Sequence, residues 1–169
     1  MSKKLKDLPH PNNLHLEAAE GWLELGNHLE ANEELELITP QLRAHPAVLE
    51  MRYKIYEAAG RWEMAAEVAR GMSELMPENP WGPFHLAYCL HELKRTQEAY
   101  DTLIPVVDKF PSEWLMLFNL ACYSCRLGKL KEAMQWLEKA IDVAGKKDVR
   151  QQALDDPDLE PLWTQIGEI

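Results

Sequence analysis

One pattern recurs at a fixed spacing along most of this chain, and it limits the possible folds more than any other feature. Each copy places a turn residue five positions before an alanine, so that Ala31, Ala65, Ala99 and Ala133 stand in one register. The turn residue is glycine in the first, second and fourth copies and Lys94 in the third. On both sides of each turn, apolar residues recur three and four positions apart, as in an amphipathic helix. The sequence therefore predicts repeated pairs of helices.

The repeat length and the helical periodicity resemble those of tetratricopeptide repeat proteins, whose unit is a helix–turn–helix of about 34 residues. The repeats are residues 12–45, 46–79, 80–113 and 114–147. The resemblance implies an all-α fold, a right-handed α-solenoid of antiparallel helix pairs. Residues 1–11 are expected to form a flexible N-terminal arm, and residues 148–169 a C-terminal capping segment over the open end of the last repeat.

Several positions depart from the regular pattern. Pro40 and Pro105 lie inside the predicted second helices of their repeats, where each is expected to remove a hydrogen bond and bend its helix. Arg52 and Tyr53 stand where the resembled family has a large apolar residue followed by a small one, so these helices should be spread, with the arginine stem reaching toward solvent. Lys94 should cost about 1 kcal/mol if its turn is left-handed.

Composition narrows the class of protein further. With 46% hydrophobic residues the chain has enough apolar surface for a continuous core. The sequence has no apolar run of about 18 residues, and its N-terminus lacks the apolar centre of a secretory signal, so a membrane location is not expected. Three cysteines, an odd number, fit a reducing compartment. The expected location is the cytoplasm.

Charge is distributed unevenly along the chain, whose formal net charge is −10. Residues 12–45 carry seven acidic residues and one basic residue, whereas residues 114–147 carry six basic and three acidic residues. Nucleic acid is not an expected partner, because phosphate binding needs clustered Lys and Arg along a surface. The acidic first repeat favours a basic partner or a head-to-tail contact between copies at low salt.

In the resembled family, one side of each first helix lines a concave groove. Here the matching positions are largely acidic in repeats one and two, and aromatic or apolar in repeats three and four, which is typical of a binding surface when such side chains are exposed. The candidate partner-binding residues are Glu50, Lys54, Trp81, Phe84, His85, Tyr88, His91, Leu115, Phe118 and Cys122. The capping segment, the N-terminal arm or a second copy of the chain are alternative occupants of this stripe.

The resemblance implies a non-catalytic protein–protein interaction scaffold that needs no cofactor and holds a peptide or helical segment of another protein in its groove. We expect an apolar or proline-containing part of the ligand on the aromatic half and a basic part on the acidic half. The alternative is a self-assembly module that forms a weak homodimer through the aromatic face or through its charge-opposed ends.

A zinc or redox role for the cysteines is a third reading of the sequence. Cys122 and Cys125 lie in the C-terminal half of a predicted helix, where the helix dipole does not lower a thiol pKa. A structural zinc site needs four ligands, and only Cys89 with a displaced His85 or His91 would complete the set. Buried, inert thiols are the expected outcome. A chaperone-tail clamp of Lys, Asn and Arg is not matched by the groove positions.

Overall fold

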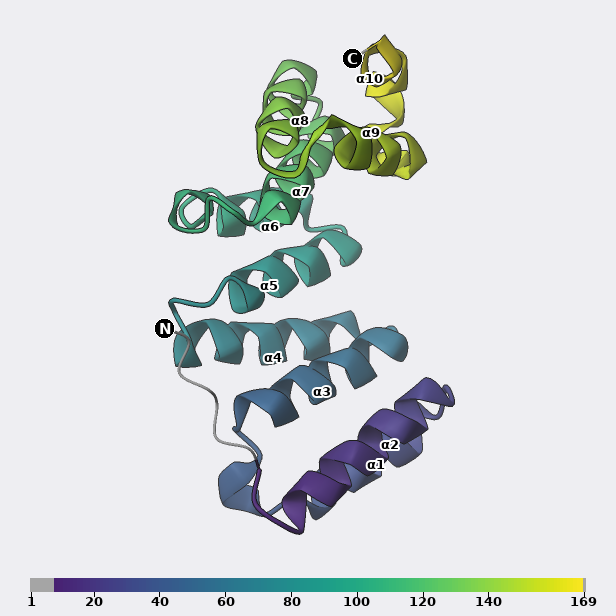
Figure 1. The fold of residues 1–169 in the computed structure, drawn as a ribbon, viewed down its shortest axis with the longest axis vertical. Coiled ribbons are helices and arrows are strands. Elements are labelled where there is room, and N and C mark those ends of the chain that lie inside the picture. The colour runs from purple at the N-terminus through teal and green to yellow at the C-terminus, as the bar shows by residue number, and fades with distance from the viewer. Residues whose placement is uncertain (1–7, 169) are drawn as a thin grey trace.

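The computed structural model describes residues 8–168 and arranges them as an elongated stack of helices (Figure 1). The α-helices are α1 (Asn12–Glu24), α2 (His28–Leu37), α3 (Pro46–Ala58), α4 (Trp62–Leu75), α5 (Trp81–Glu92), α6 (Thr96–Leu103), α7 (Trp114–Arg126), α8 (Leu130–Ala144), α9 (Lys146–Asp155) and α10 (Trp163–Glu168). Three short 3-10 helices are η1 (Pro40–Leu42), η2 (Val107–Lys109) and η3 (Pro157–Leu162). Successive helices from α1 to α8 pack as antiparallel neighbours, which confirms the predicted all-α solenoid.

The small residues at the helix crossings are completely buried. Each has a relative exposure of 0%, because close approach of two helix backbones leaves room for no more than a methyl group. They are Ala19, Ala31, Ala65, Ala87, Ala99, Ala121 and Ala133. These contacts determine how the two helices of each repeat are aligned against each other.

Each helix pair is joined by a turn in the left-handed conformation. Gly26, Gly60 and Gly128 have φ of 76°, 65° and 78°, and Lys94 holds the same place with φ of 63°. Glycine reaches this region without a Cβ clash, whereas a side chain there costs about 1 kcal/mol. Lys94 therefore keeps the left-handed turn geometry in spite of this cost.

The prediction that Pro40 and Pro105 bend their helices is wrong, because both helices stop instead. The α-helix α2 ends at Leu37, and Pro40 opens the separate helix η1; α6 ends at Leu103, before Pro105, and η2 follows. Proline has no N–H to donate, and its ring collides with the preceding turn, so ending the helix is less costly than bending it. The amide of Thr39 beside the first break is satisfied by the side-chain oxygen of Asn12 at 2.8 Å.

Repeat two accommodates its large residues by inter-repeat contacts. Tyr53 occupies the small-residue position and is only 1% exposed. Its hydroxyl lies 3.7 Å from the thiol of Cys89 in α5. Arg52 does not reach toward solvent as predicted: its guanidinium lies 2.8 Å from Glu36 of α2, and its side chain is 16% exposed. The hydrogen bond from Arg52 lowers the pKa of Glu36, which favours the ionised carboxylate in this pair.

The C-terminal segment packs against the last repeat through α7 and α8. Leu159, Leu162 and Ile166 are at most 1% exposed, and the Asp156 side chain accepts a hydrogen bond from the Asp158 amide at 2.9 Å at the start of η3. Trp163 remains 36% exposed and donates its indole N–H to the Ala153 carbonyl. The cap therefore closes the last repeat mainly through aliphatic side chains.

The core is unevenly divided along the stack. Its largest cluster of buried residues lies in α5 to α10, a smaller one surrounds Tyr53 and Cys89, and another joins α1, α2 and α3. Leu8, inside the predicted arm, is 7% exposed and belongs to that N-terminal cluster, whereas arm residues 1–7 lie outside the described residues. Within residues 8–168, no helix combines the length and apolarity needed to cross a bilayer.

Candidate functional site: a pocket between the third and fourth repeats

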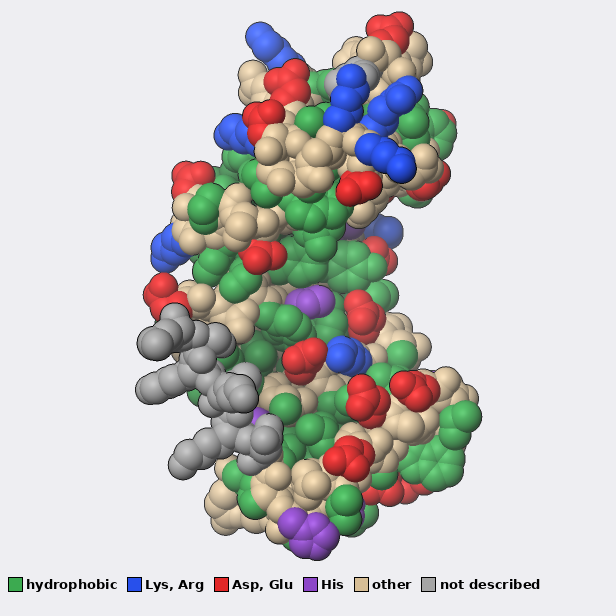
Figure 2. Space-filling view, viewed as in Figure 1, with side chains coloured by type: hydrophobic (Ala, Val, Ile, Leu, Met, Phe, Trp, Pro, Cys, Tyr) green, Lys and Arg blue, Asp and Glu red, His purple; other side chains and the backbone are tan. Residues whose placement is uncertain are grey.

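Charge and apolar surface separate along the molecule, as Figure 2 shows for one face. Acidic side chains gather over the lower part, where α1 and α3 lie, and hydrophobic side chains dominate the middle, over α5 and α7. Lys54 of α3 is half exposed and paired with Glu50 at 3.2 Å, one turn earlier on the same helix. Glu50 and Lys54 therefore neutralise each other's charge. The remaining acidic residues give this region its net negative charge.

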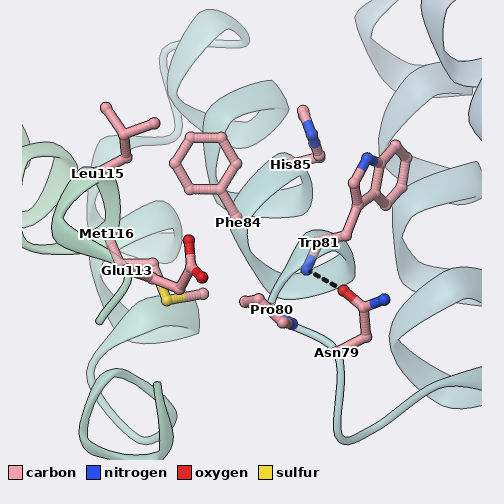
Figure 3. A pocket seen from close by; sticks show the side chains of 8 residues that line it. All are labelled: Asn79, Pro80, Trp81, Phe84, His85, Glu113, Leu115 and Met116. Atoms are coloured by element: carbon pink, nitrogen blue, oxygen red, sulfur yellow. Dashed lines mark hydrogen bonds between the residues drawn. The ribbon is translucent and has the colours of Figure 1, made fainter. Parts of the chain in front are cut away.

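A pocket of about 260 Å³ opens between the first turns of α5 and α7 (Figure 3). Four of the predicted groove residues line it: Trp81, Phe84, His85 and Leu115. Leu115 is 36% exposed, so the apolar wall of the pocket faces solvent. The pocket exists because α5 and α7, the first helices of successive repeats, begin with large side chains that project from neighbouring positions.

His85 sits within a cluster of aromatic rings at one side of this pocket. Its ring centroid lies 4.5 Å from that of Tyr53, 4.2 Å from that of Trp81 and 5.1 Å from that of Phe84. Burial, reinforced by the positive charge of Lys54, lowers the pKa of His85 to about 4. The imidazole is therefore neutral near pH 7, and its Nδ1 is a buried polar atom without a hydrogen-bond partner. The neutral ring therefore adds no charge to the apolar wall, and its unpaired nitrogen is enclosed by the surrounding side chains.

The loops before α5 and α7 supply the rest of the lining. The side-chain oxygen of Asn79 accepts a hydrogen bond from the Trp81 amide at 2.9 Å, which fixes the start of α5 and the direction of the indole. Glu113 occupies the same position in the third repeat as Asn79 does in the second. The remaining lining residues are Pro80 and Met116. The sequence analysis missed Asn79, Pro80, Glu113 and Met116 because it considered only the groove side of each helix. The equivalent positions of Asn79 and Glu113 in successive repeats could have indicated that both lie near this site.

Tyr88 and His91 continue along α5 away from the pocket and have other neighbours. Tyr88 packs edge-on against Trp62 of α4, with ring centroids 5.8 Å apart. His91 Nε2 lies 2.6 Å from Asp158 Oδ2, and Nδ1 lies 3.1 Å from the Thr96 hydroxyl. The His91 contact lowers the pKa of Asp158, so this carboxylate is ionised where the capping segment meets repeat three. His91 therefore holds the cap in place.

Phe118 and Cys122 do not line an open groove, contrary to the sequence expectation. They are 1% and 4% exposed, because η3 of the capping segment lies against α7. The Cys122 thiol lies 3.5 Å from Asp156 Oδ2, and burial raises its pKa. Burial likewise raises the pKa of Cys89 to about 11, so both thiols are protonated near pH 7. Among residues 8–168, no three His, Cys, Asp or Glu side chains converge as a metal site requires.

Comparison with known proteins identifies the fold. No protein-family model matches the chain, and no curated protein sequence matches it significantly. The crystal structure of MamA superposes with a TM-score of 0.66 at 16% identity, over 89% of this chain and 90% of that chain. The crystal structure of a Podosopora anserina putative kinesin light chain with nearly identical TPR-like repeats superposes with a TM-score of 0.67 at 21% identity, over 95% of this chain and 94% of that chain. A variant of that protein superposes with a TM-score of 0.65 at 21% identity, over 95% of this chain and 96% of that chain.

Proposed function

Given that this chain folds as a tetratricopeptide-repeat solenoid, we propose that it is a protein-binding scaffold which holds an extended or helical segment of a partner against α3, α5 and α7. The observation that carries this proposal is the pocket at Trp81, Phe84 and Leu115, a solvent-open apolar site on the face where the first helices of successive repeats lie side by side. Exposed aromatic and aliphatic side chains that converge on one pocket are the usual anchors of a protein interface.

The size of the pocket favours a peptide side chain over a whole small molecule. Its volume of about 260 Å³ lies below the range of about 300–1000 Å³ that is typical of ligand pockets. We infer that it takes a proline or a large aliphatic side chain, which would pack against the Trp81 and Phe84 rings. The neutral His85 imidazole beside them adds no charge to this wall, which favours an apolar over a charged side chain in the pocket.

The acidic side chains of the lower face add a second, electrostatic requirement. The first repeat has seven acidic residues and one basic residue, and a basic stretch of the ligand would be attracted to it. Such contacts at a solvated rim act mainly on the association rate and on salt dependence. The expected ligand is a peptide with an apolar or proline-containing part and a Lys- or Arg-containing part, bound with micromolar or weaker affinity.

A peptide-display screen followed by matched substitutions tests this function. Leu115→Ala removes an exposed leucine from the pocket wall, and Leu130→Ala removes one of similar exposure from α8, outside the pocket; the two are 36% and 40% exposed. We expect Leu115→Ala and Phe84→Ala to weaken selected peptides, the latter by about 2 kcal/mol as for a buried interface anchor, and Leu130→Ala to leave them unchanged. Enrichment of acidic peptides, or equal binding by both leucine variants, would overturn the proposal.

Sedimentation of the unliganded protein separates the scaffold from the self-assembly alternative. A scaffold with a free pocket is expected to sediment as a monomer at micromolar concentration, at low and at moderate salt. A dimer that dissociates on Phe84→Ala would mean that a second copy occupies the aromatic face, and the self-assembly function would then replace the peptide-binding one.

A further inference from the structure

The outward side of α1 is an apolar helix face that no other described helix covers. Leu14, Trp22 and Leu25 are 48%, 38% and 77% exposed. With 100° between successive residues of an α-helix, the three positions fall within an arc of about 80°. They form one continuous stripe, which we call the α1 outer face. This stripe is distinct from the pocket between α5 and α7.

The repeat register shows what kind of element such a face receives. The positions equivalent to Leu14 in the later repeats are Val48, Gly82 and Met116, all buried, and those equivalent to Trp22 are Tyr56, Leu90 and Ser124, of which Tyr56 is half buried and the others buried. In those repeats the second helix of the preceding repeat covers the face: α2 packs on α3, α4 on α5 and α6 on α7. The α1 outer face has the same place in its repeat and lacks that covering helix among residues 8–168.

One of these contacts shows how closely a covering helix can approach when the residue beneath it has no side chain. A Cβ built on Gly82 of α5 would lie 2.6 Å from the backbone nitrogen of Ser73 in α4. The helices of these successive repeats thus approach to backbone contact. An element that covers α1 in the same way must be helical, because a loop would leave its own backbone groups unpaired against this apolar surface.

Charge identifies the chemistry of the missing helix. Glu17 and Glu24 are exposed and flank the stripe on one side of α1, about 60° to 80° from Leu14 on a helical wheel. A second copy that docked through the same face would bring these carboxylates against their own equivalents, which is unfavourable. A helix with Lys or Arg beside its apolar stripe would instead pair with them. We propose that the α1 outer face binds a basic amphipathic helix of another protein, which stacks on α1 as α2 stacks on α3, where Val48 holds the place of Leu14.

The sequence of α4 provides the probe for this proposal. A helix-stapled peptide with the α4 sequence, residues 62–75, carries three acidic residues and one basic residue. A second peptide with Glu67→Lys and Glu74→Lys reverses that balance and keeps the apolar stripe, because both glutamates are exposed in the protein. We expect the basic peptide to bind the full chain at least tenfold more tightly than the native-sequence peptide at low salt, with the difference shrinking as salt is added.

Matched leucine variants locate the binding. Leu25→Ser should weaken the basic peptide tenfold or more, whereas Leu75→Ser, at a 50% exposed leucine of α4, should not. Both leucines are largely exposed, so folding is preserved and circular dichroism verifies it. The proposal would be overturned if the two peptides bound with equal affinity, or if neither bound at a concentration of about 1 mM. It would also be overturned if the two serine variants had equal effects. A homodimer that Leu25→Ser dissociates would likewise overturn it. Leu115→Ala should have no effect, which keeps this test independent of the pocket.

Discussion

At the scale of single residues, burial decides which members of the aromatic stripe remain available to a partner. Phe84 and Phe118 occupy the same position of successive repeats, yet Phe84 lines an open pocket and Phe118 is 1% exposed beneath the capping segment. Their chemistry is identical, but α7, which carries Phe118, packs against η3 of the capping segment, whereas Phe84 lines a pocket that is open to solvent. Helical spacing in the sequence predicts which side chains share one face of a helix. Packing between segments distant in the sequence then decides which of them stay exposed.

His85 gives this pocket a testable pH dependence. Its pKa is lowered to about 4 in the folded chain, against about 6.5 for an unfolded histidine, because burial disfavours the imidazolium. Between these values the unfolded chain binds a proton that the native chain does not, so stability should decrease as the pH falls from about 6.5 to about 4.

Two measurements check the His85 prediction. In His85→Asn, which does not titrate, the slope of unfolding free energy against pH should be shallower over this interval. The imidazole resonances of His85 in the native protein should titrate near pH 4. A titration midpoint near 6.5 would mean that the ring is solvated and that the aromatic enclosure described above does not form.

At the scale of helices, the alanines at the crossings allow the two helices of each repeat to pack closely. Ala133 is 0% exposed where α8 meets α7, whereas Ala144 is half buried at the last residue of α8. Ala133→Leu must separate two helices at their closest approach, which typically costs about 1–3 kcal/mol, while Ala144→Leu adds its side chain at a helix end. Thermal unfolding should show a clearly lower melting temperature for Ala133→Leu. Equal melting temperatures would mean that the helix register is wrong.

The helices themselves were largely predictable from the sequence, and the exceptions have local causes. The helices α4 and α8 run without a break through the second halves of their repeats, because their apolar spacing is uninterrupted. The α-helices α2 and α6 are shorter than predicted, since hydrophobic periodicity continues through Pro40 and Pro105 although the backbone hydrogen bonding does not. Periodicity records which side chains face the core and is insensitive to such a break.

The candidate site was predictable in part. Trp81, Phe84, His85 and Leu115 follow from the repeat register and share one pocket. The covering of Cys122 by Asp156 does not follow from it, because the cap lies outside the repeats and does not continue their spacing. A contact between a thiol and a carboxylate so far apart in the sequence requires the fold to be known first.

At the scale of the whole molecule, buried surface is concentrated toward the C-terminal end. Helix α7 has eight buried residues, whereas α1 has two. In a solenoid each repeat contacts only its neighbours, so stability is a sum of local contributions and the less buried end opens first. Native-state hydrogen exchange should therefore show slower amide exchange in α7 and α8 than in α1 and α2. Equal protection across the four helices would indicate a single cooperative unit.

The approach of α4 to α5 at Gly82 has a mechanical consequence. Because the Ser73 backbone leaves no room for a Cβ at this position, the crossing is a fixed fulcrum between the first two repeats and the last two with their cap. An elongated body amplifies a rotation at its centre into a larger displacement at its ends. A side chain at residue 82 would thus change the distance between the α1 outer face and the pocket between α5 and α7, and with it the separation of the two partners proposed for these sites.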